Sequence, residues 1–162
     1  MELETNLPAI IDKDDHAKDI FKPNNKGLLH CLSTVLLQEV ERYNKLLTKM
    51  ATSLALLMKA IKGLVIMSPE LDLMYTALMK NQVPPNWSEV AYPSLKPLAS
   101  WIKDLNFRVE FMRNWIKHGH PACFWLSGFF FPHGFMTGTL QTYARKHQKA
   151  IDLLQFKFTV MT

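Results

Sequence analysis

Residues 121–160 read PACFWLSGFFFPHGFMTGTLQTYARKHQKAIDLLQFKFTV, and the order of residue types in this stretch indicates how the chain folds. Its first part, up to Phe131, is too apolar for a surface loop, and Gly128 indicates a bend or a close backbone approach. Pro132 suits the first position of a helix, which we expect to run to about His147. The stretch therefore predicts a packed aromatic turn followed by a helix.

The end of the same stretch has the pattern of a β-strand. Phe156, Phe158 and Val160 occupy every second position, which predicts a strand with one apolar face. A lone strand at a chain end has nothing to pair with, and its edge groups would stay unsatisfied. We therefore expect that the sequence is cut off just as a β region begins.

Upstream, the residues from about Gly27 to Gly63 have strong helical periodicity, with apolar side chains mostly three or four positions apart. They form either one long helix or two helices broken near Thr48–Ser53, and the length suggests a helix that spans an assembly. The apolar stripe comprises Leu28, Leu32, Val35, Leu36, Val40, Tyr43, Leu47, Met50, Leu54, Leu57, Met58, Ile61 and Leu64. The opposite face is expected to hold Glu39, Glu41, Arg42, Lys45, Lys49 and Lys59.

A shorter helix and a connection follow. Ser68 reads as the N-cap of a helix that ends near Lys80, because a proline and a glutamate follow it in the first turn. Residues 81–97 are expected to form a long irregular connection. Trp87 and Tyr92 are expected to pin this connection to the body of the protein, since long loops without packing are uncommon.

Another helix is expected from about Pro97 to Gly119, where the glycine suits a C-cap and Pro121 prevents continuation. These elements predict a mainly α fold class: a helical layer of long amphipathic helices with a single β-strand at the C-terminal end, a truncated α+β domain. Residues 1–25 are expected to be a loose acidic lead-in, and residues 26–162 the helical domain itself.

The net charge of +5 is unevenly distributed along the 162 residues. Residues 1–20 hold six acidic side chains against two lysines, so the remaining residues carry 17 Lys and Arg against 8 Asp and Glu. This basic excess fits either an acidic partner surface or a solvated basic face. The cations form no dense run like those of nucleic-acid binders, and no apolar run approaches the ~20 residues that cross a bilayer.

The sequence contains none of the motifs GxxxxGK[ST], HExxH or CxxC. Cys31 and Cys123 are far apart among core-like residues, so we expect two reduced, buried thiols in an intracellular protein. His118 and His120 flank Gly119, but two histidines without carboxylate or thiol neighbours are a weak metal signature and also suit a helix end. We expect no catalytic residue, no cofactor and no metal.

The aromatic residues are expected to serve packing or interfaces rather than to line a ligand pocket. The three Phe side chains of residues 129–131 cannot all point the same way, so at least one is expected to face a neighbouring element or domain. Tyr143 is expected to pack inward. The expected packing or interface residues are Trp87, Tyr92, Trp101, Trp115, Trp125, Phe129, Phe130, Phe131, Tyr143, Phe156 and Phe158.

Several segments together resemble the C-terminal domain of axonemal dynein heavy chains. VLLQEVERYNKLLTKM at 35–50, AIKGLVIMSPEL at 60–71 and YPSLKPLASWIKDL at 92–105 look like motifs of that family. Trp115 and Gly119 occupy the places of its W-x-x-x-G pattern, and FWLSGFFF, YARK and IDLL complete the likeness. The matches follow the family's order and cover about four fifths of the chain.

Two places depart from the family pattern. Pro132-His133-Gly134 stands where the family commonly has a Thr-Gln-Ala-like start after the triple Phe. The closing residues 155–160 read QFKFTV where the family usually has an acidic strand near GFDFEV. The second departure removes or reverses charge on the exposed face of the expected strand, so it bears on an interface rather than on the fold.

The resemblance implies the helical half of the domain and the first strand of a β-barrel that packs across a motor ring. The parent would be a minus-end-directed microtubule motor in the cytoplasm and cytoskeleton, at the axoneme of cilia or flagella. ATP hydrolysis belongs to other parts of that parent, so the implied role is non-catalytic and mechanical. The implied partners are the AAA+ ring modules and, through the parent complex, dynein intermediate, light intermediate and light chains and the microtubule, with no nucleic acid and no membrane.

Two other classes of protein stay open at this point. One is a stand-alone helical interaction protein that binds dynein subunits in trans. The other is a basic helical binder of nucleic acid, an anionic membrane or another acidic partner. Binding of the last kind would weaken steeply with salt, because phosphate contacts release counterions.

Overall fold

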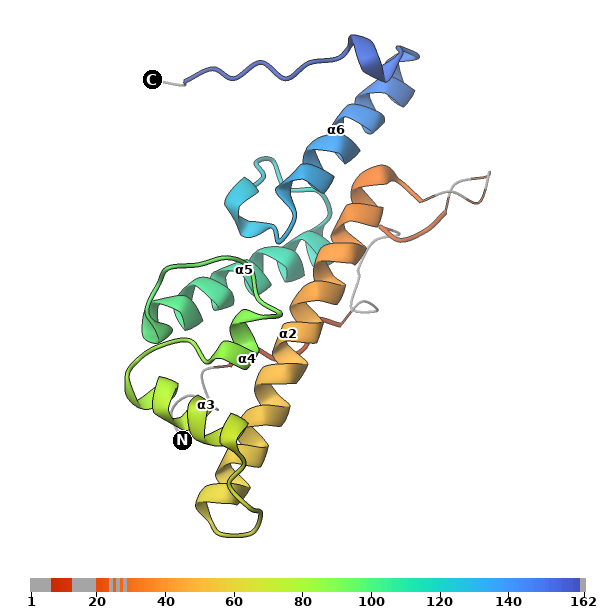
Figure 1. The fold of residues 1–162 in the computed structure, drawn as a ribbon. Helices are drawn as coiled ribbons and strands as arrows, with labels where there is room; N and C mark the ends of the chain where they lie inside the picture. The colour runs from red at the N-terminus through yellow and green to blue at the C-terminus, as the bar shows by residue number, and fades with distance from the viewer. Residues whose placement is uncertain (1–6, 13–19, 24, 26, 28, 161–162) are drawn as a thin grey trace.

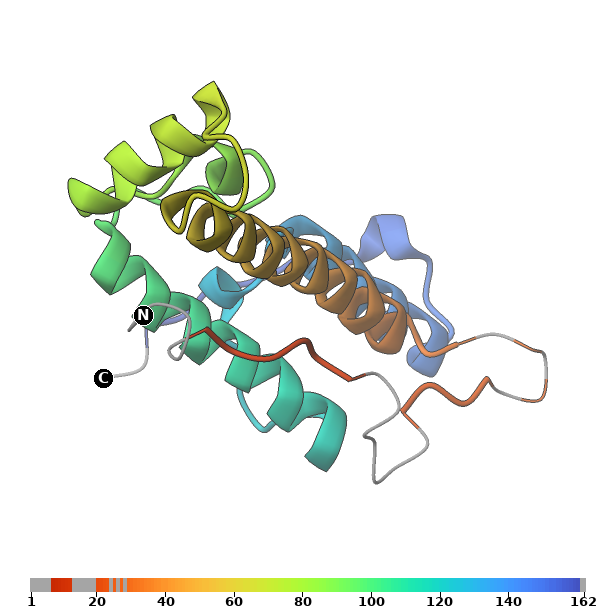
Figure 2. The ribbon, with the colours of Figure 1, turned by 90° about the horizontal axis from the view of Figure 1, so that it is seen from below.

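In the computed structural model, residues 7–12, 20–23, 25, 27 and 29–160 are described. One long helix, α2, runs through the molecule, and the other helices lie along it (Figure 1). Seen from below, α3 and α5 flank α2 on different sides (Figure 2). The helices are α2 (Cys31–Ile61), α3 (Pro69–Met79), α4 (Pro85–Ser88), α5 (Leu98–His118) and α6 (Pro132–His147), with short 3-10 turns η1 (Leu126–Gly128) and η2 (Ile151–Leu153).

α2 is a single unbroken helix of 31 residues, which decides between the two alternatives that the periodicity left open. Glu39 lies on its buried face and is only 1 % exposed, although the pattern placed it on the opposite, charged face. It follows Leu36 by three positions and precedes Tyr43 by four, so it shares their side of the helix. The other five charged residues predicted for the outer face are exposed.

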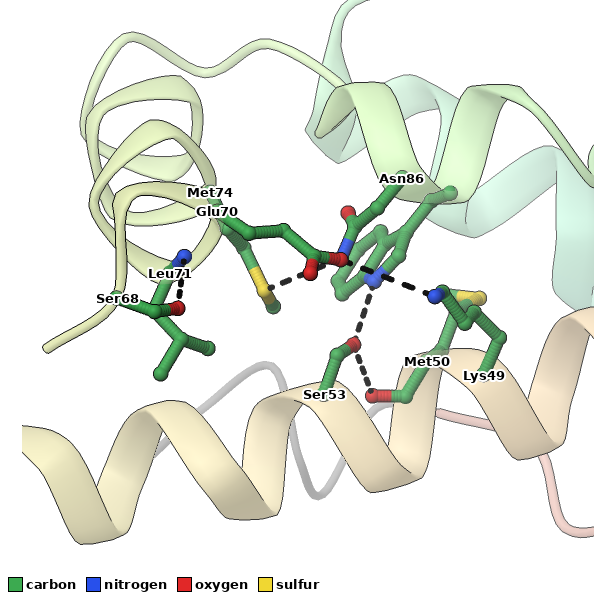
Figure 3. A network of polar contacts seen from close by, with 9 residues as sticks. Lys49, Met50, Ser53, Ser68, Glu70, Leu71, Met74 and Asn86 are labelled. Atoms are coloured by element: carbon green, nitrogen blue, oxygen red, sulfur yellow. Dashed lines mark hydrogen bonds and ion pairs between the residues drawn. The ribbon is translucent and has the colours of Figure 1, made fainter. Parts of the chain in front are cut away.

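Hydrogen bonds fasten the start of α3 and the single turn of α4 in place (Figure 3). Ser68 Oγ accepts a hydrogen bond from the Leu71 N–H at 3.3 Å, so the predicted N-cap of α3 is confirmed. The indole Nε1 of Trp87 donates to Ser53 Oγ at 2.8 Å, and this hydroxyl donates to the Met50 carbonyl at 3.1 Å. The α2 backbone therefore holds α4 through a buried indole.

The connection between α3 and α5 is more ordered than its sequence indicates, because α4 interrupts it. Trp87 and Tyr92 are 0 % and 4 % exposed, so both anchor this connection in the core. Asn86 Nδ2 donates to Glu70 Oε1 at 3.4 Å, and Lys49 Nζ lies 3.8 Å from the same oxygen (Figure 3). Side chains of α2, α3 and α4 thus meet in one network.

α5 begins and ends where the sequence predicts. Gly119 follows it with φ of 89°, a left-handed conformation that glycine adopts without steric cost. On the buried side, the Trp101 ring stacks against Trp87 at 6.3 Å and against Tyr92 at 5.9 Å between centroids. This aromatic stack joins α5 to α4 and the connection that follows it.

The predicted C-terminal strand is not formed. Among the described residues there is no β-strand, and residues 154–160 form an extended tail beyond α6 (Figure 1). Phe158 and Val160 are 78 % and 92 % exposed. A strand is stabilised by hydrogen bonds to a neighbouring strand, and this segment has no such neighbour in the described residues. The prediction of a strand was therefore wrong for this structure, whereas the mainly helical fold class is confirmed.

Of the expected acidic lead-in, residues 1–6, 13–19 and 24 lie outside the described residues. Ile11, within the described part, is 2 % exposed, and both its N–H and its C=O bond the Asn44 side chain at 2.8 and 2.9 Å. This piece therefore packs on α2, a contact that hydrophobic periodicity did not indicate.

The two cysteines have different surroundings, so the prediction that both are buried was wrong for one of them. Cys31 is buried in the first turn of α2, whereas Cys123 is exposed in the loop between α5 and η1. In that loop it is Phe124 that turns inward, with its ring edge-on to Trp115 at 5.0 Å. The neighbouring cysteine is left on the outside.

Candidate interaction surfaces

The loop after α5 is fastened to α2 by a buried carboxylate. Glu39 accepts hydrogen bonds from the backbone N–H groups of Phe130 and Phe131, the latter at 3.0 Å. One turn further along α2, the Tyr43 hydroxyl donates to the Gly128 carbonyl at 2.6 Å. We call residues 127–131 the SGFFF turn. Two polar side chains on one face of α2 therefore fix its backbone.

Burial of Glu39 raises the pKa of its carboxyl above the ordinary value. The two backbone hydrogen bonds and the positive charges of Arg42 and Arg108 oppose this shift. Arg42 lies 3.6 Å from Glu39 Oε1 and 5.4 Å from the centroid of the Phe131 ring. The hydrogen bonds and the two arginines thus offset part of the free-energy cost of burying this carboxylate.

A second buried charge, Arg108, joins α5 to the segments directly before and after this helix. Arg108 Nε donates to Asp104 Oδ2 at 2.6 Å, and Lys96 Nζ donates to the other oxygen of that carboxylate at 2.6 Å. The guanidinium lies 3.9 Å from the Tyr92 ring centroid and 5.2 Å from that of Trp125. Burial raises the pKa of Asp104, but the two hydrogen bonds outweigh it and hold this pKa below its ordinary value.

All but one of the expected packing or interface residues divide into two groups, and the exception, Phe130, is half-buried. The structure buries Trp87, Tyr92, Trp101, Trp115 and Phe129, each at most 4 % exposed, in the core. It leaves large parts of the others at the surface: Trp125 36 %, Phe131 49 %, Tyr143 45 %, Phe156 38 % and Phe158 78 % exposed. Only the second group is available to a partner.

The three consecutive Phe side chains have three different surroundings. Phe129 stacks on Phe135 of α6 at 4.7 Å between ring centroids. Phe130 is half-buried, edge-on to Tyr43 at 4.6 Å. Phe131 is exposed beside Arg42. Phe129 also lies edge-on to Trp115 of α5, at 6.1 Å between ring centroids. The turn therefore connects α2, α5 and α6 and also presents one ring to solvent.

Tyr143 does not pack inward, contrary to the prediction. It lies on the exposed side of α6, where its ring contacts His147 at 4.1 Å between centroids, one turn further along. Together with Leu140, Leu154 and Phe156 it lines an apolar groove of about 330 Å³ between α6 and the tail. The tyrosine therefore faces an open groove rather than the core.

An apolar surface at the far end of α2 is larger than the sequence indicates. We call residues 61–67, which join α2 to α3, the tip. Ile61 and Leu64, assigned to the buried stripe, are 54 % and 71 % exposed, and Ile66 is 89 % exposed. Gly63 adopts a left-handed conformation with φ of 72° and ends the helix, so the residues after it no longer share a helix face with the core. That glycine was the signal available in the sequence.

The histidines, cysteines and carboxylates do not gather into a cluster of metal ligands in the part of the protein that the structure describes. Within it, no three His, Cys, Asp or Glu side chains lie close enough to hold a metal ion. His120 instead accepts a hydrogen bond from the Trp115 indole at 3.1 Å. Within the same residues, none of the helices combines the length and hydrophobicity that crossing a membrane requires.

The comparisons with known proteins agree on one family. The family profile for the C-terminal domain of the dynein heavy chain matches residues 1–162. Dynein axonemal heavy chain 6 of Homo sapiens is 48 % identical over 159 residues, which is 98 % of this chain and 4 % of that protein. Dynein axonemal heavy chain 1 of Rattus norvegicus is 57 % identical over 131 residues, 81 % of this chain and 3 % of that protein.

A relative from a distant organism matches over nearly the whole sequence. It is the dynein-1-beta heavy chain of the flagellar inner arm I1 complex from Chlamydomonas reinhardtii, 48 % identical over 163 residues. The match covers 99 % of this chain and 4 % of that protein. The chain thus spans about 3–4 % of the length of these relatives.

Proposed function

The chain belongs to the family of C-terminal domains of dynein heavy chains, and we propose that it is the non-catalytic C-terminal part of an axonemal-type dynein heavy chain. Its parent would be a minus-end-directed microtubule motor that moves cilia or flagella. The observation that carries this proposal is the 48 % identity to an axonemal heavy chain over 98 % of the present chain. The flagellar relative supports the same assignment.

The proposed place of action is the axoneme of a cilium or flagellum, within the cytoskeleton. The proposed direct partners are the AAA+ ring modules of the same heavy chain. Intermediate, light intermediate and light chains and the microtubule are reached through the parent complex. The relatives' names support the proposed place of action, since they are axonemal or flagellar dynein heavy chains.

The proposed role is mechanical. Glu39 and Tyr43 of α2 hold the SGFFF turn through hydrogen bonds to its backbone. Phe129 of the same turn packs on Trp115 of α5 and on Phe135 of α6, so the turn holds the three helices together. Densely packed elements transmit displacement rather than absorb it. The tip and the tail present apolar side chains for contact with a neighbour, and the tail would gain its strand partners from a β region of the parent protein.

The proposal is tested in a recombinant axonemal dynein motor from which residues 31–160 are deleted. We expect ATP hydrolysis to persist, because no nucleotide-binding motif lies in this segment, and microtubule gliding to slow or stop. A motor with Phe107→Ala, a 70 % exposed residue on α5, serves as the control and should glide normally. Equal gliding with and without the segment would refute a mechanical role.

A further inference from the structure

Two histidines meet where α2 begins and α5 ends. His30 is the N-cap of α2, and His120 lies just after Gly119. Their ring centroids are 5.4 Å apart, with 54° between the ring planes. Neither residue belongs to the SGFFF turn, the tip or the tail.

Each of these imidazoles accepts a hydrogen bond through Nδ1. His30 Nδ1 accepts from the Leu32 backbone N–H at 3.3 Å, which caps the helix. His120 Nδ1 accepts from the Trp115 indole Nε1–H at 3.1 Å. A ring nitrogen that accepts a hydrogen bond carries no proton, so both rings are neutral in this arrangement, with their protons on Nε2.

Protonation would remove both acceptors and place two positive charges close together. Burial lowers the pKa of His120 and the nearby His30 lowers it further, so the folded protein already disfavours charge there. Within three positions of the two histidines, the described residues hold the titratable groups Cys31, Lys117, His118 and Cys123. The charge that lowers the pKa of His120, besides burial, is that of His30.

We propose that His30 and His120 form a proton-operated catch that closes the junction between α2 and α5 when both rings are neutral and opens it when they are protonated. The loop after His120 is attached at the same place, because Phe124 packs on Trp115 at 5.0 Å and on Phe135 of α6 at 4.7 Å. Opening the catch therefore loosens the contact of α5 with α6. This inference does not depend on the proposed motor function.

The direction of the pH effect follows from the lowered pKa of His120. An unfolded histidine binds its proton at about pH 6.5, whereas the folded protein binds it at a lower pH. In the window between these values the unfolded state holds more protons, so stability falls as the pH falls. The contribution is fully present above pH 6.5 and is lost as the pH drops through this window.

The test is an NMR titration of the protein between pH 7.5 and 5.0, following the Trp115 indole N–H and the Leu32 amide. We expect the Trp115 indole signal to shift with a midpoint below 6.5, and the Leu32 amide signal to shift in the same titration. We also expect amide exchange at Leu32, corrected for its intrinsic rate, to become at least tenfold faster at the acid end. Constant signals over the whole range in the unmodified protein would overturn the proposal without any variant.

Matched variants separate the catch from general acid effects. His30→Asn keeps an N-cap acceptor, and His120→Gln keeps a side-chain oxygen for the indole, but neither residue titrates. The double variant should lose the coupled shifts, whereas His147→Gln, on α6 outside the junction, should keep them. A double variant that titrates like the unmodified protein would equally overturn the proposal.

Discussion

At the scale of single residues, a few buried charged side chains hold separate segments of the protein together. Glu39 sits on the apolar face of α2 because the turn it faces has two backbone N–H groups that no helix or sheet satisfies. Arg108 is likewise buried against Asp104 and two aromatic rings. Glu39 joins α2 to a turn far away in the sequence, whereas Arg108 joins α5 to the segments directly before and after it.

Replacing Glu39 tests this joint. Glu39→Ala removes the acceptor of the part-buried N–H groups of Phe130 and Phe131, and we expect this to cost about 1–3 kcal/mol in total. Glu39→Gln should cost less, because its amide oxygen can still accept from one of them. Urea titrations at low protein concentration measure the change in the unfolding midpoint.

The matched control for Glu39 is Glu110→Gln on α5. Glu110 is exposed and accepts a hydrogen bond from Asn114, which a glutamine oxygen can also accept. Its effect should stay within about 0.5 kcal/mol, as for other surface substitutions. If Glu39→Ala unfolds at the same urea concentration as this control, the carboxylate does not hold the turn.

The core residues of α5 give a second prediction. Leu105 and Trp115 are 0 % and 1 % exposed. Leu105→Ala and Trp115→Ala should each destabilise the protein by roughly 2–5 kcal/mol, since the cavity left behind adds to the lost apolar burial. Phe107→Ala on the exposed side of α5 should change the urea midpoint little. Similar midpoints for all three variants would show that the facing of α5 is wrong.

At the scale of elements, α2 and α6 approach each other closely at a glycine. A Cβ at Gly138 would lie 3.0 Å from Val35 Cγ2 and 3.6 Å from the Cys31 carbonyl oxygen. The absence of a side chain there lets the two helices pack against each other. Because α6 in turn carries the tail, the spacing of these two helices sets the position of the C-terminal segment.

A larger side chain at this crossing should therefore separate the helices. Gly138→Val is expected to destabilise the protein by about 1–3 kcal/mol through overpacking. Thr137→Val, at the neighbouring exposed position, should have little effect, since it only exchanges a hydroxyl for a methyl group of similar size at the surface. Thermal unfolding followed by circular dichroism compares the two.

A double-mutant cycle identifies the cause. In a protein with Gly138→Val, the further change Val35→Ala should restore part of the stability, with a coupling of about 0.5–3 kcal/mol as for residues in contact. Strictly additive effects of the two substitutions would contradict a steric clash between these positions.

At the scale of the whole molecule, two apolar regions lie at opposite ends of the long helix. The tip is at one end of α2, and the tail extends from α6 near the other (Figure 1). Contiguous exposed apolar residues of this kind mark interaction sites or cause aggregation. A molecule with both is suited to bridging two neighbours, in line with the proposed bracing role.

The isolated protein should therefore self-associate as its concentration rises. Sedimentation velocity should show larger species at high concentration. The substitutions Leu64→Ser and Ile66→Ser at the tip, or Phe158→Ser and Val160→Ser in the tail, should reduce them, because these side chains are 71 %, 89 %, 78 % and 92 % exposed. A protein that sediments as a monomer at every concentration would show that these surfaces do not drive association.

The local features of this protein follow from its sequence alone. Helix periodicity placed α5 and α6 within a residue or two of their observed ends, and Ser68, Gly119 and Pro132 marked boundaries through their own backbone preferences. These signals are readable because capping and apolar spacing depend on neighbours three or four positions away. The motifs that resemble dynein heavy chains are local in the same sense.

Features that depend on partners distant in the sequence follow only from the tertiary packing. That packing placed Glu39 in the core and Tyr143 at the surface, exposed Cys123 and the tip, packed Ile11 on α2, and left residues 156–160 unpaired. Whether a charge is buried, an aromatic ring exposed or a strand paired depends on the segment that packs against it. The spacing of apolar residues along one helix does not show which distant segment will pack against it. Periodicity alone therefore could not predict these features.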